Sequence, residues 1–119
     1  MHSIGNRRIF VSMTKRELDI AGIIGARIKS KDPHAEVILF GSHARGQAHE
    51  ESDWDILILI NQPKKNRSIE AGYRDEIFEI ELEVGEPIST LIYSKSDWET
   101  LHVHSPLYKS IQKEGIHIA

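Results

Sequence analysis

Two aspartates separated by one residue, Asp53 and Asp55, are the strongest chemical feature of the sequence. The apolar run ILILI at 56–60 follows them and predicts a buried strand that begins with the two acids. Residues i and i+2 of a strand point to the same face, so the carboxylates are expected to converge. Carboxylates that close repel each other unless a cation lies between them. Mg²⁺ is the natural candidate, because it combines carboxylates with phosphate oxygens and water.

A Gly-Ser pair, Gly41-Ser42, ends an earlier apolar run, VILF at 37–40. Glycine lets the backbone approach a ligand closely, and successive amides beside a serine hydroxyl can hold phosphate oxygens. Arg45 lies in the same turn. Its guanidinium is suited to neutralising phosphate charge by paired hydrogen bonds. The other interpretation of Arg45 is a surface residue that ties down the loop.

The elements that must position these residues are readable from capping signals and hydrophobic spacing. Thr14 and Glu17 match a capping box and predict a helix over about 15–30. Apolar runs predict strands at 35–40, 53–60 and 87–93, the second of them covered on both faces.

The segment 68–84 allows two interpretations, because FEIELEV alternates as a strand does while its longer window has a helical apolar face. Gly85 at its end favours the helix. Ser96 to Glu99 predicts the start of a short helix, and Ser105-Pro106 predicts the start of the last one. The expected fold class is α/β or α+β, with a small mixed sheet packed against helices.

Composition limits the class of protein further. A length of 119 residues predicts a single domain over 1–119, with its core at about 14–95. The chain has no cysteine, which excludes disulfides and thiolate metal sites, and its formal net charge of −3 does not indicate a nucleic-acid acceptor. No run has the length of a membrane span or a signal peptide, so we expect a cytoplasmic protein.

The combined motif resembles the signature of the nucleotidyltransferase superfamily, the polymerase-β-like proteins. That signature is Gly-Ser, about ten residues, then Asp-x-Asp, and here it reads Gly41-Ser42, ten residues, Asp53-Trp54-Asp55. The Ala44-Arg45-Gly46 triplet and Ser52 fit the minimal stand-alone members. Many of those members are encoded beside a helical partner protein.

The resemblance implies a nucleotidyltransferase fold that moves a nucleoside monophosphate from a nucleoside triphosphate, with ATP expected, to a hydroxyl of an unidentified acceptor. Gly41, Ser42 and Arg45 would hold the triphosphate. Asp53 and Asp55 would be the catalytic carboxylates and the ligands of Mg²⁺, in a one-metal or two-metal site.

The chain departs from the family pattern in its third carboxylate. The strand expected to carry it, PISTLIY at 87–93, contains no acid, and Ser89 or Thr90 stands in its place. An acid at 79, 81 or 83 (Glu79, Glu81 or Glu83) could substitute if that segment is a strand beside the aspartates. If it is a helix, these acids form a solvated face, which is the favoured interpretation.

Several other residues are given structural roles. His43 and His49 are interpreted as loop residues, His102 and His104 are not expected to ligate a metal, and Trp54 is expected to pack in the core. The leading hypothesis is a Mg²⁺-dependent nucleotidyltransferase. The alternative is a catalytically reduced nucleotide-binding or antitoxin-like module. The short chain has little room for an acceptor-binding domain, so a helical partner protein or a homodimer is expected to complete the cleft.

Overall fold

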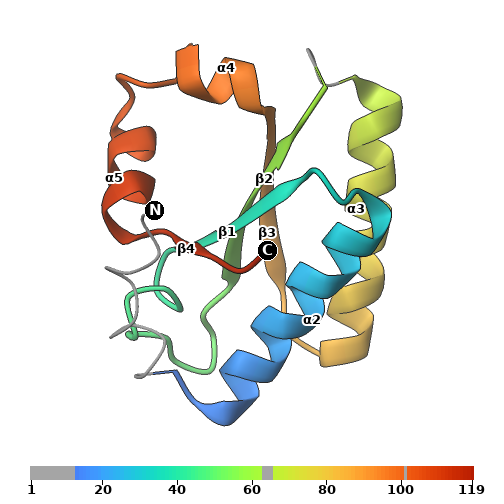
Figure 1. Ribbon diagram of the computed structural model, residues 1–119. Helices are drawn as coiled ribbons and strands as arrows, with labels where there is room; N and C mark the ends of the chain where they lie inside the picture. The colour runs from blue at the N-terminus through green and yellow to red at the C-terminus, as the bar shows by residue number, and fades with distance from the viewer. Residues whose placement is uncertain (1–12, 63–65, 101) are drawn as a thin grey trace.

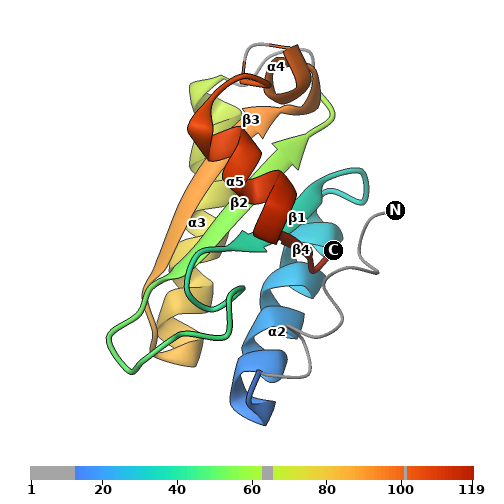
Figure 2. The same ribbon diagram turned by 90° about the vertical axis from the view of Figure 1, so that its left-hand side faces the viewer.

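The computed structural model describes residues 13–62, 66–100 and 102–119, which form a four-stranded sheet with helices on both faces (Figures 1 and 2). The strand order is β3-β2-β1-β4. Strand β1 pairs antiparallel with both β2 and β4, whereas β2 and β3 are parallel. The strands are β1 (Glu36–Phe40), β2 (Trp54–Ile60), β3 (Ile88–Ser94) and β4 (Ile116–His117). This mixed α/β architecture confirms the expected fold class.

Helix α2 (Lys15–Lys31) confirms the helix predicted from the capping box. The Thr14 side chain accepts from the Glu17 amide, and the Glu17 carboxylate accepts from the Thr14 amide at 2.9 Å. The helix buries an isoleucine face against the sheet, and Ile24 and Ile28 have no exposed surface.

Helix α3 (Arg67–Val84) settles the ambiguity of 68–84 in favour of a helix. Asn66 caps its start by accepting from the Ile69 amide, and Gly85 ends it with a φ of +75°, in the left-handed region. The long helix also supplies the crossover that the parallel pair β2 and β3 requires.

Alternating residues of the strands face two separate cores. Helices α2 and α3 cover one face of the sheet, and α4 (Lys95–Thr100) and α5 (Pro106–Glu114) lie on the other (Figures 1 and 2). Trp54, Ile56 and Ile58 belong to the cluster under α2 and α3, whereas Leu57 and Leu59 pack with Trp98 of α4 and Ile111 of α5. Strand β2 is therefore covered on both faces, as predicted.

Two details of the last third of the chain differ from the prediction. Helix α4 begins at Lys95 rather than after Ser96, because Ser94 Oγ accepts from the Asp97 amide at 3.1 Å. The predicted cap, Ser96, therefore lies two residues after the serine that caps the helix. The edge strand β4 was not predicted, since two residues are too few to show a pattern. Ser105 does cap α5, with Pro106 at its first position.

Among the residues that the structure describes, no helix has both the length and the apolar character needed to cross a membrane.

Candidate functional site

The turn after β1 brings the backbone at Gly41 directly against the Asp55 carboxylate. Gly41 has a φ of +78°, a conformation that side-chain-bearing residues rarely adopt. A Cβ placed on it would collide with Oδ2 of Asp55. The turn is closed by a hydrogen bond of 3.0 Å from the Arg45 amide to the Gly41 carbonyl. The amides of Ser42, His43 and Ala44 come before the Arg45 amide in this turn. They correspond to the first amides of a helix, which have no hydrogen-bond partner within the helix.

The predicted pair of carboxylates is present at the start of β2. Asp53 directly precedes the strand and is exposed, whereas Asp55 is the second strand residue and is partly buried. Both alternate with Trp54 and so lie on the face of the sheet that α5 covers. The Gly41 turn and these two acids therefore meet at one edge, as the spacing of the motif predicts.

Ser89 of β3 occupies the position beside the two acids. The register pairs Ser89 with Asp55, and Ser89 Oγ donates to Asp53 Oδ2 at 3.1 Å. Thr90 points the other way, and its buried hydroxyl has no hydrogen-bond partner among the described residues. Of the two candidates on β3, Ser89 rather than Thr90 therefore lies beside the two aspartates.

The surroundings of Asp55 disfavour the ionised form of its carboxyl group. Burial raises the pKa of Asp55, and the like charge of Asp53 raises it further. A cation between the two side chains would relieve both effects, because it restores a favourable environment for the ionised forms.

The stacked rings of Trp54 and His43, called the clamp below, pack on the opposite face of the sheet from the two aspartates. Trp54 has no exposed surface, and its indole nitrogen donates to Glu86 Oε1 at 2.8 Å. The His43 ring stacks on it with centroids 3.9 Å apart and planes 10° apart. Core packing of Trp54 is confirmed. The interpretation of His43 as a loop residue is right for its backbone, but the side chain is buried.

The capping box of α2 continues into this clamp. Glu17 Oε2 lies 2.7 Å from His43 Nδ1, while the other carboxylate oxygen of Glu17 accepts from the Thr14 amide. Burial alone would raise the pKa of Glu17, but the Thr14 amide and the His43 ring outweigh it and hold the pKa below its usual value. The first turn of α2 therefore anchors the motif turn as well as itself.

Sequence reasoning missed one acid at the site, Glu114, the last residue of α5. Its Oε2 accepts from the Gly41 amide at 3.2 Å and from Arg45 Nη1 at 3.0 Å. Arg45 also donates from Nε to Gln47 Oε1 at 3.1 Å. The only sequence signal for Glu114 was its place just before Gly115, which marks a helix end but no partner.

The acids proposed as substitutes for the third carboxylate lie elsewhere. Glu81 of α3 accepts from the Ile88 amide at 2.7 Å, and Glu83 pairs with Arg27 of α2 at 3.1 Å. Glu79 is exposed on the same helix. Because α3 covers the face opposite to Asp55, none of the three extends the site.

The other histidines singled out from the sequence, His49, His102 and His104, lie outside the site. His102 packs against Tyr93 and Trp98, with ring centroids 4.4 Å and 5.7 Å away. His104 is exposed, and His49 accepts from the Glu51 amide in the loop before β2.

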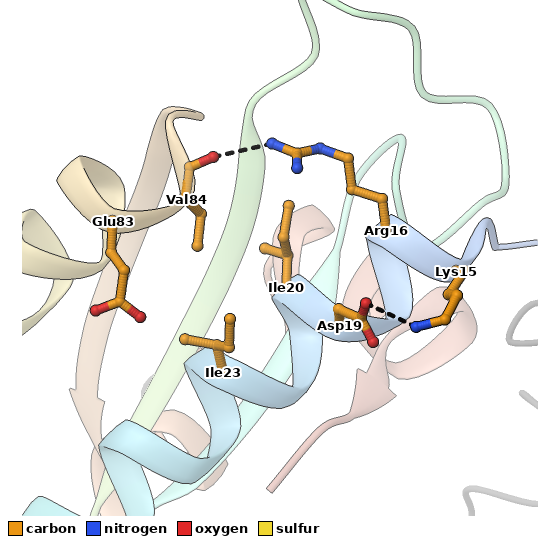
Figure 3. A pocket seen from close by; sticks show the side chains of 7 residues that line it. All are labelled: Lys15, Arg16, Asp19, Ile20, Ile23, Glu83 and Val84. Atoms are coloured by element: carbon orange, nitrogen blue, oxygen red, sulfur yellow. Dashed lines mark hydrogen bonds and ion pairs between the residues drawn. The ribbon is translucent and has the colours of Figure 1, made fainter.

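A hollow of about 410 Å³ lies between α2 and α3 (Figure 3). Ile20 and Ile23 form its apolar wall, and Arg16 crosses its rim to donate to the Val84 carbonyl at 2.9 Å. This hollow lies on the layer opposite to Asp55 and is separate from the candidate site.

The two aspartates fit a hard divalent cation that is completed by a ligand. Both offer oxygen donors on one face, and the raised pKa of Asp55 reflects the repulsion that a cation would remove. Within residues 13–62, 66–100 and 102–119, no three His, Cys, Asp or Glu side chains are grouped to hold a metal. Mg²⁺ needs no such cage, because it is usually held by one or two carboxylates with substrate phosphates and water.

Comparison with known proteins agrees with this geometry. Residues 23–117 match the model of a family described as the nucleotidyltransferase domain, and this range includes Gly41, Arg45, both aspartates and Glu114. A protein of Methanocaldococcus jannaschii, named "Putative protein adenylyltransferase MJ0141", is 59% identical over 32 residues. That similarity covers 27% of this chain and 32%, or about a third, of the relative.

Proposed function

This chain belongs to the nucleotidyltransferase domain family, and we propose that it transfers a nucleoside monophosphate from a nucleoside triphosphate to a hydroxyl group, releasing pyrophosphate. ATP is the proposed donor and a protein hydroxyl the proposed acceptor. The name of the Methanocaldococcus relative supports both choices, since it describes protein adenylylation.

The single observation that carries this proposal is the fit between Gly41 and Asp55. A turn that carries phosphate-binding amides is pressed against a carboxylate so closely that only glycine can stand there. A triphosphate held on the turn would therefore place its oxygens beside Asp53 and Asp55. That arrangement is what a Mg²⁺–triphosphate complex requires.

Each residue then has a defined part. The turn of Gly41 and Ser42, with the Arg45 guanidinium, holds the triphosphate. Asp53 and Asp55 hold Mg²⁺, and the chemistry that the ion supplies when bound is neutralisation of charge on the phosphate oxygens. Ser89 orients the Asp53 carboxylate through its hydrogen bond of 3.1 Å.

A second candidate function is a nucleotide-binding module with reduced catalysis, which acts through a partner protein. Ser89 favours it, because the serine leaves β3 without the acid that acts on the incoming hydroxyl in the family. In this case the triphosphate site is kept while transfer is slow or lost. A helical partner or a second copy of the chain is proposed to cover the site in either case.

The test is a transfer assay with radiolabelled triphosphates. The protein is incubated with Mg²⁺ and each α-labelled nucleoside triphosphate, alone and with candidate protein or RNA acceptors. Labelled acceptor and free pyrophosphate are then measured. We expect label transfer from ATP that is reduced at least about a hundredfold by Asp53→Asn with Asp55→Asn, a loss typical of removed catalytic electrostatics.

Exposed Asp75→Asn on α3 is the matched control for a carboxylate-to-amide change. Transfer that survives the double change would contradict the assignment of the two aspartates. Binding of ATP without turnover on any acceptor would support the reduced module instead.

A further inference from the structure

The carboxylate of Glu114 occupies the donors that the proposed function gives to the triphosphate. Its Oε2 accepts from the Gly41 amide, the first donor of the phosphate-binding turn, at 3.2 Å. The same oxygen accepts from the Arg45 guanidinium at 3.0 Å. One anionic side chain of the protein therefore already takes up a backbone amide and an arginine that a phosphate oxygen would use.

The position of the Glu114 carboxylate at the end of α5 is electrostatically unfavourable. Glu114 is the last residue of α5, and a negative charge at a helix C-terminus is disfavoured by the helix dipole. Only 20% of its side-chain surface is exposed, so water does not offset this cost fully. It also raises the pKa of Asp55 through its like charge. The contacts with Gly41 and Arg45 compensate for these unfavourable terms.

The chain around Glu114 holds it at the end of β1. Gly115 follows at once, and a Cβ on Gly115 would lie 2.8 Å from the Ile38 side chain of β1. Strand β4 then pairs with Ile38 and Leu39, two positions before Gly41. In Figure 2 the last turn of α5 accordingly lies beside the end of β1, where the motif turn begins. Beyond β4, Val37 exchanges hydrogen bonds with Ile118 and Ala119, and Ile116 is fully buried, so this tether holds the end of α5 in place.

We propose, resting on the function proposed above, that Glu114 is an internal competitor of the triphosphate. In the free protein its carboxylate occupies the Gly41 amide and the Arg45 guanidinium, and it must leave both donors when a phosphate group binds. Glu114 thus lowers the affinity of the site for phosphate. Nucleotide binding is consequently coupled to a movement of the Glu114 side chain.

A Glu114→Gln substitution separates competition from support. Glutamine keeps an oxygen that can accept from the Gly41 amide, but it removes the charge that competes for Arg45. If Glu114 competes, this variant binds phosphate more tightly. If Glu114 instead contributes to binding by orienting Arg45, the variant binds more weakly. The two roles therefore predict changes of opposite sign.

The experiment is an equilibrium titration with two probes, inorganic tripolyphosphate and ATP, each with and without Mg²⁺ at low ionic strength. Wild type is compared with Glu114→Gln, with Glu114→Asp, whose shorter side chain cannot reach both donors, and with Glu79→Gln. The last variant makes the same charge change on an exposed site of α3. Circular dichroism and thermal midpoints establish that each variant is folded.

We expect Glu114→Gln to lower the Kd for tripolyphosphate about two- to fivefold, the range given by loss of one partly exposed ion pair. Glu114→Asp is expected to gain less, and Glu79→Gln to match wild type. An unchanged or higher Kd for Glu114→Gln would overturn the proposal, as would a failure of every variant to bind tripolyphosphate. Gained tripolyphosphate affinity without any binding of ATP would uphold the competition and contradict the nucleotidyl-transfer function.

Discussion

At the scale of single residues, the site depends on glycine at position 41, because glycine has no Cβ. Its missing Cβ leaves room for the Asp55 carboxylate, and its φ of +78° turns the chain away from β1. The spacing of Gly-Ser and Asp-x-Asp predicted this meeting because both pairs end or begin strands that are neighbours in the sheet. Neither residue would reveal a site alone.

The unfavourable charge of Asp55 gives a prediction about stability and pH. Since burial and Asp53 raise the pKa of Asp55 in the folded state, the folded protein binds that proton more tightly than the unfolded chain does. The protonated Asp55 carboxyl therefore contributes fully to the free energy of unfolding below the ordinary aspartate pKa. This contribution is lost as the pH rises through the raised pKa of the folded state. We expect Asp55→Asn to be more stable than wild type at pH 7, by about 0.2–1 kcal/mol.

The measurement is urea unfolding between pH 3 and pH 8, in EDTA and again with Mg²⁺. The difference between Asp55→Asn and wild type should fade toward low pH, where the wild-type carboxyl is protonated, and should shrink when Mg²⁺ is added. A difference that is constant over this range, or equal to that of the exposed control Asp75→Asn, would show that Asp55 carries no charge penalty.

Two residues at the site could not be predicted from the sequence, for separate reasons. Glu114 is 73 positions from Gly41, and the pairing of β4 with β1 that brings it there leaves no readable pattern. His43 is buried because Trp54 stacks on it and Glu17 binds its ring, and both contacts depend on the folded arrangement. In contrast, Asp53, Asp55 and Gly41 were readable because the motif keeps them close in sequence.

At the scale of elements, local signals predicted most of the fold. The capping box of α2 and the left-handed Gly85 after α3 correspond to hydrogen bonds and dihedral angles of the structure. The start of α4 was misplaced because Ser94 and Ser96 are both suitable caps. Only the end of β3 determines that Ser94 points toward the first turn, where it accepts from the Asp97 amide.

The parallel pairing of β2 and β3 places Ser89 where a third carboxylate would complete the site, which predicts the effect of restoring one. Because Ser89 Oγ lies 3.1 Å from Asp53 Oδ2, a carboxylate at this position adds a third negative charge to the cluster. We expect Ser89→Asp to lower the free energy of unfolding in EDTA by about 1 kcal/mol through like-charge repulsion. Mg²⁺ should restore it.

Differential scanning calorimetry with and without Mg²⁺ measures this effect. The control is Ser89→Ala, which removes the hydrogen bond to Asp53 and adds no charge, so it should gain no more stability from Mg²⁺ than wild type does. If Ser89→Asp gains no more from Mg²⁺ than Ser89→Ala does, Ser89 is not positioned to extend a metal site.

At the scale of the whole molecule, the two faces of the sheet have different roles, one structural and one at the candidate site. The face under α2 and α3 holds the larger core and the clamp of Trp54, while the face under α4 and α5 carries the acids and Glu114. The helix that covers the site face is the one that delivers the competing carboxylate. The motif turn thus contacts both layers, α5 through Glu114 and α2 through the pair of His43 and Glu17.

We propose above all that Gly41, Asp53 and Asp55 form one site for a triphosphate with Mg²⁺. Isothermal titration calorimetry of ATP binding, with Mg²⁺ and with EDTA, tests it most directly. We expect Mg²⁺ to tighten ATP binding by about tenfold or more in wild type. Asp53→Asn with Asp55→Asn should abolish this gain while leaving the weak metal-free binding intact. Equal Mg²⁺ enhancement in wild type and the double variant would contradict it.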